Sequence, residues 1–153
     1  MNKSEFFTND RILVTGGAGF LGKEVVSSLI NYGAREENII VPRSKEFDLR
    51  KPEAALAMME KYAPDYVIHL AARLGGIGDN MAHPAAYFFD NMMLGLNIIE
   101  ASRKSGVKKL VNIGTVCSYP KIVPAPFKEE DLWEGYPEET NAPYGEKGCN
   151  GLC

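Results

Sequence analysis

The chain has 153 residues, of which 45% are hydrophobic and 24% are charged, proportions typical of one globular domain and unlike those of disordered or fibrous chains. Its 17 basic and 20 acidic residues give a net charge of −3, which excludes the broad cationic surface that binds nucleic acid or an anionic membrane. No apolar run approaches the roughly 20 residues that span a bilayer, and the N-terminus lacks the apolar segment of a signal peptide, so we expect a cytoplasmic protein.

The chain begins with a predicted strand, a glycine-rich turn and a helix. Residues 11–15 are an apolar run of the kind that forms a buried parallel strand. Residues 16–22 lead into a helix that runs to about Tyr32 and ends at Gly33, because glycine enters the left-handed region without a Cβ penalty. Apolar residues at helical spacing predict the face that packs on a sheet: Leu21, Val25, Val26, Leu29 and Ile30.

A second strand and a second helix follow. The strand is expected at residues 38–41 and ends at Pro42, which cannot donate to a β-ladder. The helix begins near Pro52 and ends near Ala63, since proline is favoured in the first turn. Its inner side is predicted to carry Ala55, Met58, Met59 and Tyr62.

The third strand and the fourth strand are separated by a long helix. We expect the third strand at residues 66–71, a glycine-rich loop at 75–78, a helix at 84–105 and the fourth strand at 109–114. The inner face of this helix is predicted at Phe88, Met92, Gly95 and Ile99. Residues 119–143 are rich in proline and acidic residues and predict an exposed lid or cover.

This alternation of strands and helices is typical of an α/β fold. We expect a Rossmann-like doubly wound parallel sheet, truncated after about four strands, with helices on both faces. The strands are predicted in the spatial order 3-2-1-4. Residues 1–147 would form this incomplete dinucleotide-binding domain, and residues 148–153 an atypical tail.

The glycine-rich turn carries the strongest chemical signal. Gly16, Gly19 and Gly22 have the spacing GxxGxxG, directly after a predicted strand and at the start of a predicted helix. Glycines let a backbone approach a pyrophosphate, whose charge meets the free N–H groups of the helix. The candidate cofactor residues are Gly16, Gly17, Ala18, Gly19, Phe20, Leu21 and Gly22. A structural turn without ligand is the alternative.

The end of the second strand predicts which dinucleotide is bound. NAD-binding folds usually place an acidic residue there to hold the ribose hydroxyl, whereas this chain has Arg43. A guanidinium pairs with a 2′-phosphate, so Arg43 favours NADP over NAD, unless it is a solvated surface arginine. Asp48 and Leu49 lie close enough in sequence to reach the adenine, although Asp48 is equally suited to cap a turn.

Further motifs add a family resemblance. HLAA at residues 69–72, DNMMLGLNIIEA at 90–101 and NAPYG at 141–145 resemble the extended short-chain dehydrogenase/reductases. More narrowly, RLGGIGDN at 73–80 and GTVCSYPK at 114–121 resemble the GDP-L-fucose synthase family. The likeness runs from about residue 11 to 147. It implies NADPH as cofactor, a GDP-4-keto-6-deoxy-mannose substrate that is epimerised at C3 and C5 and reduced at C4, and a homodimer.

The resemblance also implies roles for individual residues. Ala71, Ala72 and Arg73 would line the cofactor at the end of the third strand. Thr115 takes the place of a serine that assists at the substrate keto group, and Cys117 matches the cysteine that exchanges protons during epimerisation. The proton donor to the carbonyl oxygen would be Tyr144, helped by Lys147, because a nearby cation lowers the pKa of a phenol.

Each of these residues also has a structural interpretation. Cys117 suits a buried apolar thiol at a strand end, Thr115 a residue that satisfies its own backbone, and Tyr144 an aromatic at the rim of the sheet. His69 lies in an apolar strand and is expected to be a satisfied core histidine, while His83 precedes a helix. Neither histidine has metal-ligand spacing with cysteine or carboxylate, so we expect no metal site.

The pattern departs from the family after Tyr144. The family spacing is YxxxK, but here Gly148 occupies the fourth position and the lysine comes one residue early. The following residues are glycine-rich and lack helical period, and the family's substrate domain and a catalytic histidine would lie further on. We expect the tail to be foreign sequence after a truncation or frameshift. Its cysteines, Cys149 and Cys153, are too few for a closed metal site.

Three hypotheses therefore remain open at the level of sequence. The chain derives from an NADPH-dependent epimerase-reductase of GDP-sugars, from another nucleotide-sugar epimerase or dehydratase that uses NAD, or it acts as a dinucleotide-binding fragment without catalysis. Comparing affinities for NADP and NAD separates the first two. Thermal denaturation with and without NADPH tests the third, since a lack of stabilisation would count even against binding.

Overall fold

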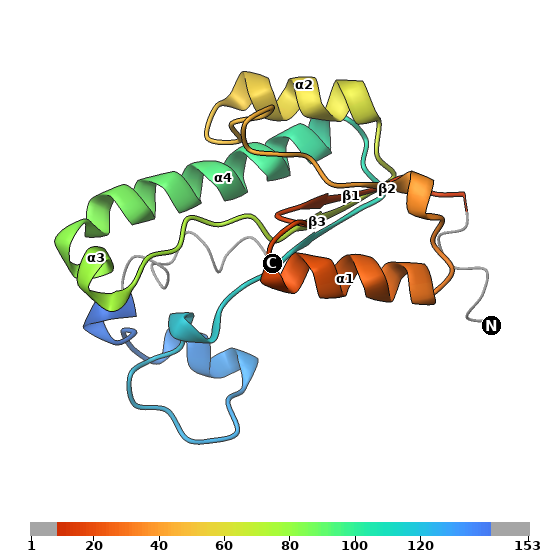
Figure 1. The fold of residues 1–153 in the computed structure, drawn as a ribbon. Helices are drawn as coiled ribbons and strands as arrows, with labels where there is room; N and C mark the ends of the chain where they lie inside the picture. The colour runs from red at the N-terminus through yellow and green to blue at the C-terminus, as the bar shows by residue number, and fades with distance from the viewer. Residues whose placement is uncertain (1–8, 142–153) are drawn as a thin grey trace. The chain divides into compact units, whose positions relative to one another are not determined.

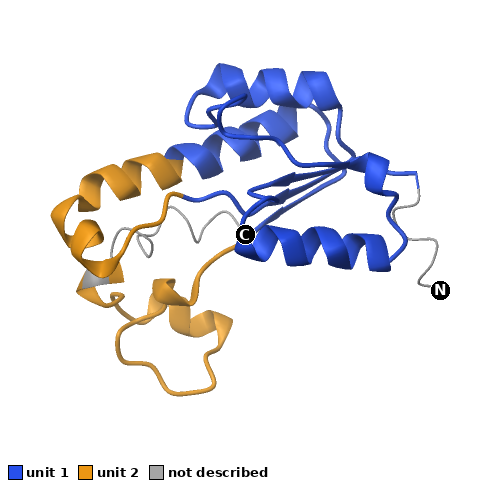
Figure 2. Ribbon diagram, viewed as in Figure 1, with its two compact units in different colours: residues 1–72, 93–112 blue, residues 73–92, 113–153 orange. Residues whose placement is uncertain are grey.

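The computed structural model of the chain describes residues 9–141 (Figure 1). It divides into two compact units (Figure 2), each of which we describe by itself. The first unit contains residues 1–72 and 93–112, and the second contains residues 73–92 and 113–153. Within the described residues, no helix is long and apolar enough to cross a membrane.

The first unit is a parallel sheet of four strands with helices on both faces. Its strands are β1 (Ile12–Thr15), β2 (Ile39–Ile40), β3 (Tyr66–His69) and β4 (Lys109–Asn112). All pair in parallel, β1 with β2 and β3, and β3 with β4. The predicted Rossmann-like α/β class is confirmed, and each strand lies within its predicted range.

Two apolar clusters fill the two faces of the sheet. On one face, α1 (Phe20–Asn31) packs Val25, Val26 and Leu29 against alternate residues of β1 and β3. The other face is covered by α2 (Pro52–Tyr62) and by residues 93–104 of α4 (Pro84–Lys104), as Figure 1 shows. This second cluster contains the larger buried side chains, among them Leu13, Met58, Met59, Val67 and Ile98.

The order of the strands differs from the predicted 3-2-1-4: the sheet reads β2-β1-β3-β4. The connection from β1 to β2 passes through α1 on one face, whereas the connections through α2 and α4 lie on the opposite face. Crossovers between parallel strands are right-handed, so helices on opposite faces carry the chain in opposite directions along the sheet. For this reason β3 pairs with β1 on the side away from β2.

The helix faces also differ in part from the prediction. In α1, Leu21 and Ile30 are exposed. The strands β1 and β2 are short, so a narrow face of the helix is enough to cover the two strands. In α4, the residues that pack into the core are Leu94, Ile98 and Ala101, whereas the predicted Phe88, Met92, Gly95 and Ile99 are only partly buried. The inner face of α2 is confirmed.

Polar contacts close the amino-terminal edge of the sheet. The Lys108 ammonium lies 2.8 Å from a carboxylate oxygen of Asp10 and 2.8 Å from one of Asp65. The backbone N–H of Arg11 donates to Asp65 as well, at 2.9 Å. The hydrogen bond from Lys108 and then that from Arg11 hold the pKa of Asp65 below its usual range. The residues just before β1, β3 and β4 are therefore joined.

The second unit is built from short elements. A helix, α3 (Ile77–Ala82), forms where part of a glycine-rich loop was predicted, with Gly76 as its N-cap. In its described part, the predicted lid contains only two 3₁₀ turns, η4 (Glu129–Trp133) and η5 (Glu139–Asn141). Another 3₁₀ turn, η3 (Val116–Ser118), lies just before it. Its predicted exposure is confirmed by large apolar side chains open to solvent: Ile122, Trp133 and Tyr136.

One buried hydroxyl in the first unit predicts a stabilising substitution. Ser102 of α4 is 4% exposed, and its Oγ has no hydrogen-bond partner among the described residues. Ser102→Ala removes this unsatisfied group and adds helix propensity, so we expect the free energy of unfolding to rise by about 1 kcal/mol. Urea denaturation measures the change. Ser28→Ala, at an exposed position of α1, is the control for propensity alone. An equal gain in both variants contradicts the prediction.

Candidate functional site

The candidate site lies where the order of the sheet reverses. The chain leaves β1 toward β2 on one side and later returns to β3 on the other. In open α/β sheets, ligands bind outside the carboxyl ends of the strands at such a switch point. Here the glycine turn follows β1, and residues 70–72 follow β3.

The glycines of the turn are required by their surroundings. Gly16 has φ +72°, and a Cβ there would lie 2.9 Å from the backbone nitrogen of Ala71. A Cβ on Gly17 would lie 2.9 Å from the Val14 carbonyl oxygen, and one on Gly22 only 2.2 Å from the Gly16 carbonyl oxygen. Any larger residue would therefore push the turn away from β3 or from the start of α1.

The turn delivers the positive end of α1 to the same place. Gly19 is the N-cap, and the first turn of the helix contains no acidic residue. The N–H groups of Phe20, Leu21 and Gly22 are the ones that an α-helix leaves without intrahelical partners. Ala18 and Gly19 are exposed, and the Phe20 side chain is 95% exposed. Residues 16–22 thus form one turn that exposes residues 18–21 at the positive end of α1, an arrangement that suits an anion.

The end of β2 lies beside this turn. A Cβ on Gly17 would come within 2.9 Å of both methyl groups of Val41, which directly follows β2. Arg43 is two residues further and exposed, and its carbonyl accepts from the backbone N–H groups of Glu46 and Phe47 at 2.9 and 3.0 Å. Within residues 9–141, no acidic side chain pairs with its guanidinium. This cation is available to a ligand.

Asp48 and Leu49 have structural partners. The Asp48 carboxylate accepts from the backbone N–H of Arg50 at 3.2 Å and from its Nε at 2.8 Å. The Arg50 side chain lowers the pKa of Asp48 to about 2. The bond from the Arg50 backbone N–H makes Asp48 the cap of a turn, which was the alternative interpretation. Leu49 is buried in the core, and its carbonyl accepts from the side-chain amide of Asn97 at 2.9 Å. No described contact brings either residue to the glycine turn.

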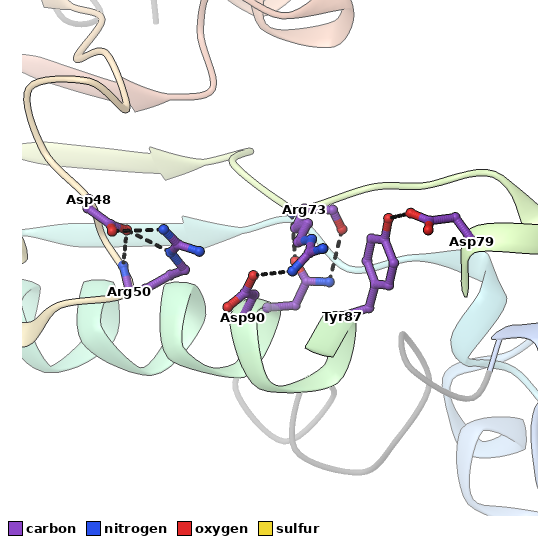
Figure 3. A network of polar contacts seen from close by, with 7 residues as sticks. Asp48, Arg50, Arg73, Asp79, Tyr87 and Asp90 are labelled. Carbon is purple, nitrogen blue, oxygen red and sulfur yellow. Dashed lines mark hydrogen bonds and ion pairs between the residues drawn. The ribbon is translucent and has the colours of Figure 1, made fainter. Parts of the chain in front are cut away.

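The residues after β3 divide between the two units. Ala71 lies against Gly16, and Ala72 is the last residue of this stretch of the first unit. Arg73 belongs to the second unit, where its guanidinium lies 2.7 Å from the Asp90 carboxylate and 4.5 Å from the ring centre of Tyr87 (Figure 3). Its charge is therefore already paired within this unit.

Around Arg73 the second unit has a polar interior that the sequence analysis missed. The Tyr87 hydroxyl donates to Asp79, which raises the pKa of the phenol, and a Cβ on Gly75 would lie 2.2 Å from that hydroxyl (Figure 3). Arg73 also exchanges backbone hydrogen bonds with the Asn91 side chain, at 2.8 and 3.1 Å. The available signal in the sequence was the three-residue spacing of Tyr87 and Asp90, which puts both on one face of α4, where the structure buries them.

Thr115 and Cys117 lie together just after β4. Thr115 caps η3, and its Oγ1 accepts from the backbone N–H of Cys117 at 3.2 Å. The local bond expected for Thr115 is thus present, and because the oxygen accepts in that bond, the hydroxyl can still donate. Cys117 is a free, partly buried thiol. A hydroxyl and a thiol are therefore held two residues apart in one turn.

The remaining candidates are accounted for as follows. Tyr144 and Lys147 lie outside the described residues, as do the cysteines of the tail. His69 is a satisfied core histidine, as predicted, with its Nδ1 2.6 Å from Thr15 Oγ1. His83 stands at the start of α4, where its carbonyl accepts from the first N–H groups.

Comparison with known proteins agrees with this geometry. Residues 12–148 match the model of the NAD dependent epimerase/dehydratase family. A GDP-L-fucose synthase from Azorhizobium caulinodans is 36% identical, and a GDP-L-colitose synthase from Yersinia pseudotuberculosis is 32% identical. Each match covers 88% of this chain and 42% of the relative, so the chain spans less than half the length of these curated relatives.

Solved structures extend the likeness to the fold. A GDP-mannoheptose C4 reductase from Campylobacter jejuni with NADP bound superposes with a TM-score of 0.82 at 31% identity, over 90% of this chain and 43% of that one. A GDP-L-fucose synthetase from Naegleria fowleri bound to NADP gives a TM-score of 0.78 at 34% identity, over 95% of this chain and 42% of that one. The resemblance to GDP-L-fucose synthases is confirmed, and the chain belongs to the NAD dependent epimerase/dehydratase family.

Proposed function

We propose that this chain supplies the NADP(H)-binding turn and acid/base residues of an enzyme that converts GDP-4-keto-6-deoxy-mannose to GDP-L-fucose. The observation that carries the proposal is the exposed glycine turn at the switch point, with Arg43 unpaired beside it. The similarity to GDP-L-fucose synthases and to GDP-sugar reductases with bound NADP supports the substrate class.

The turn suits the pyrophosphate of a dinucleotide. Its glycines leave the space that a Cβ would fill, and the first N–H groups of α1 meet negative charge without competition from an acidic side chain. Bound NADPH supplies the hydride for reduction of a carbonyl carbon. The chain's own task at this place is to hold the cofactor through backbone donors.

Arg43 decides between the two dinucleotides. A guanidinium donates in a fork that matches a phosphate, and it cannot accept a hydrogen bond from a ribose hydroxyl. An unpaired Arg43 close to the end of β2 therefore favours the 2′-phosphate of NADP. The competing function, an epimerase or dehydratase that retains NAD, requires no cation at this position.

The residues after β4 would work on the sugar. The Thr115 hydroxyl donates to the keto oxygen, and Cys117 as thiolate removes the proton from the carbon beside the ketone. The enolate that results would take a proton on its other face from the catalytic histidine that the family carries further along its chain. In the reduction, Tyr144 gives its phenolic proton to the carbonyl oxygen while hydride reaches the carbon, and Lys147 lowers the pKa of the phenol. We propose as well that the whole enzyme has a substrate domain and forms a homodimer.

The geometry of the glycine turn predicts that a substitution by alanine has different effects on stability and NADPH binding at two helical glycines, Gly22 and Gly95. Gly22→Ala places a methyl group 2.2 Å from the Gly16 carbonyl oxygen, whereas a Cβ on Gly95 of α4 meets nothing within 4 Å. We expect Gly22→Ala to destabilise the chain by about 2 kcal/mol or more and to abolish NADPH binding. Gly95→Ala should be neutral or stabilise by up to about 1 kcal/mol. Thermal denaturation with and without NADPH measures both effects. Equal stability and equal NADPH binding in the two variants would contradict the role of the glycine turn.

Substitution of Arg43 tests the choice of cofactor. We expect Arg43→Ala to weaken NADPH binding about tenfold or more and to leave NADH binding within about twofold, since one charge-assisted phosphate contact is lost. Arg35→Ala, an exposed arginine at the other end of β2, is the matched control. Titration calorimetry gives the dissociation constants. An equal loss for both dinucleotides, or tighter NADH binding by the unsubstituted chain, would favour the NAD-dependent alternative.

Turnover is tested in a fusion. Residues 1–143 of this chain are joined to the part of the Azorhizobium caulinodans GDP-L-fucose synthase that follows, so that the relative provides the tyrosine, the lysine and the substrate domain. We expect NADPH oxidation with GDP-4-keto-6-deoxy-mannose. Cys117→Ser should slow deuterium uptake from solvent at C3 and C5 by about 100-fold, because a hydroxyl is a far weaker base than a thiolate near pH 7.

The control for this fusion is Thr115→Ser, which keeps the hydroxyl and should retain NADPH oxidation within a few-fold. Unchanged deuterium uptake in Cys117→Ser would remove Cys117 from the proposal. A fusion that binds NADPH and leaves this keto-sugar unchanged would refute the substrate assignment.

A further inference from the structure

The carboxyl edge of the sheet ends in a row of polar side chains. In the strand register, Thr15 of β1 lies opposite His69 of β3, which lies opposite Asn112 of β4. Two positions earlier on the same face, the row consists of Leu13, Val67 and Leu110, all within the apolar cluster under α2 and α4. The change from apolar to polar therefore occurs at the last rung, directly before the glycine turn.

Thr15 and His69 form a buried pair in this row. Thr15 is 1% exposed and His69 is 5% exposed. Thr15 Oγ1 lies 2.6 Å from His69 Nδ1 and also accepts a long hydrogen bond, 3.4 Å, from the backbone N–H of Ala71. The oxygen accepts from the amide and keeps its hydrogen, so we assign the hydroxyl as the donor and Nδ1 as an unprotonated acceptor. Burial lowers the pKa of His69 to about 4, so the ring is neutral near pH 7.

The same backbone amide is part of the glycine turn. Gly16 follows Thr15, and its missing Cβ would lie 2.9 Å from the Ala71 nitrogen. The Ala71 amide thus donates to the Thr15 hydroxyl and also lies where the Gly16 backbone comes close to it. The Thr15 side chain therefore adds a bond to the backbone hydrogen bond from the Leu70 N–H to the Thr15 carbonyl, 3.1 Å, where the ends of β1 and β3 meet below the turn.

Packing alone gives little reason for a histidine here. A buried hydrogen-bonded pair contributes only modestly to stability, and apolar residues of similar volume fill the neighbouring rung. We propose that His69 is a positioning residue for the dinucleotide site: its Nδ1 holds the Thr15 hydroxyl, and through it the contact between Gly16 and Ala71 on which the pyrophosphate turn rests. This inference depends on the proposed NADP(H) binding.

A double-mutant cycle on NADP⁺ binding tests the proposal with the chain as it is. The variants are Thr15→Val, which replaces the hydroxyl by a methyl group, His69→Leu, which removes the acceptor, and the combination of both. His69→Asn is the rescue variant, because its side-chain oxygen can take the place of Nδ1. His83→Asn, at an exposed histidine, is the matched control.

We expect each single substitution to weaken NADP⁺ binding about tenfold, and the double substitution to weaken it no further, because both remove the same hydrogen bond. His69→Asn and His83→Asn should stay within about threefold of the unsubstituted chain. Nitrogen-15 NMR of the imidazole should show an unprotonated Nδ1 and a proton on Nε2 in the unsubstituted chain, a result that needs no variant to fold.

Three results would overturn the inference. They are a proton on Nδ1, His69→Leu binding NADP⁺ as tightly as the unsubstituted chain, or single effects that multiply to about a hundredfold in the double variant. If the unsubstituted chain binds no NADP⁺, the proposed function fails and this inference fails with it. If it binds NADP⁺ and His69→Leu binds equally well, only the role of His69 is refuted.

Discussion

The contact between the backbone of Gly16 and that of Leu70 and Ala71 is the constraint on which the rest of the first unit depends. A Cβ at Gly16 would lie 2.9 to 3.1 Å from three backbone atoms of these two residues. The chain can therefore turn sharply after β1 only where it touches the end of β3. That turn sets where α1 begins, and with it where the positive end of the helix is presented.

Local signals were sufficient to predict most elements, because the physics that sets their ends is local. Gly33 has φ +99° after α1, and Pro52 is the first residue of α2, as their backbone preferences require. The predicted strand order was wrong because the order depends on which face of the sheet each helix covers. That choice is made by packing between distant residues, and the apolar patterns of α1, α2 and α4 do not distinguish the faces.

The candidate site divides in the same way. The glycine turn was predictable because each glycine answers a steric demand within a few residues or at one strand end. Arg73 was assigned to the cofactor by the family resemblance, whereas its partner in the structure is Asp90, 17 residues away on α4. His69 was correctly predicted as a satisfied core residue, but its partner Thr15 is 54 residues distant and could not be identified from spacing.

The proposed reaction draws on residues from both units. The pyrophosphate turn, Arg43 and His69 lie in the first unit, while Thr115 and Cys117 lie in the second. The chain passes between the units after residues 72, 92 and 112. Arg73 and Asn91, near the two ends of the segment 73–92, are hydrogen-bonded to each other through the Arg73 backbone. These bonds therefore hold together the start and the end of the segment that leads from β3 to residues 93–104 of α4. The Arg73 guanidinium pairs with Asp90 inside the same unit, so its side chain adds a second bond between the start of this segment and α4.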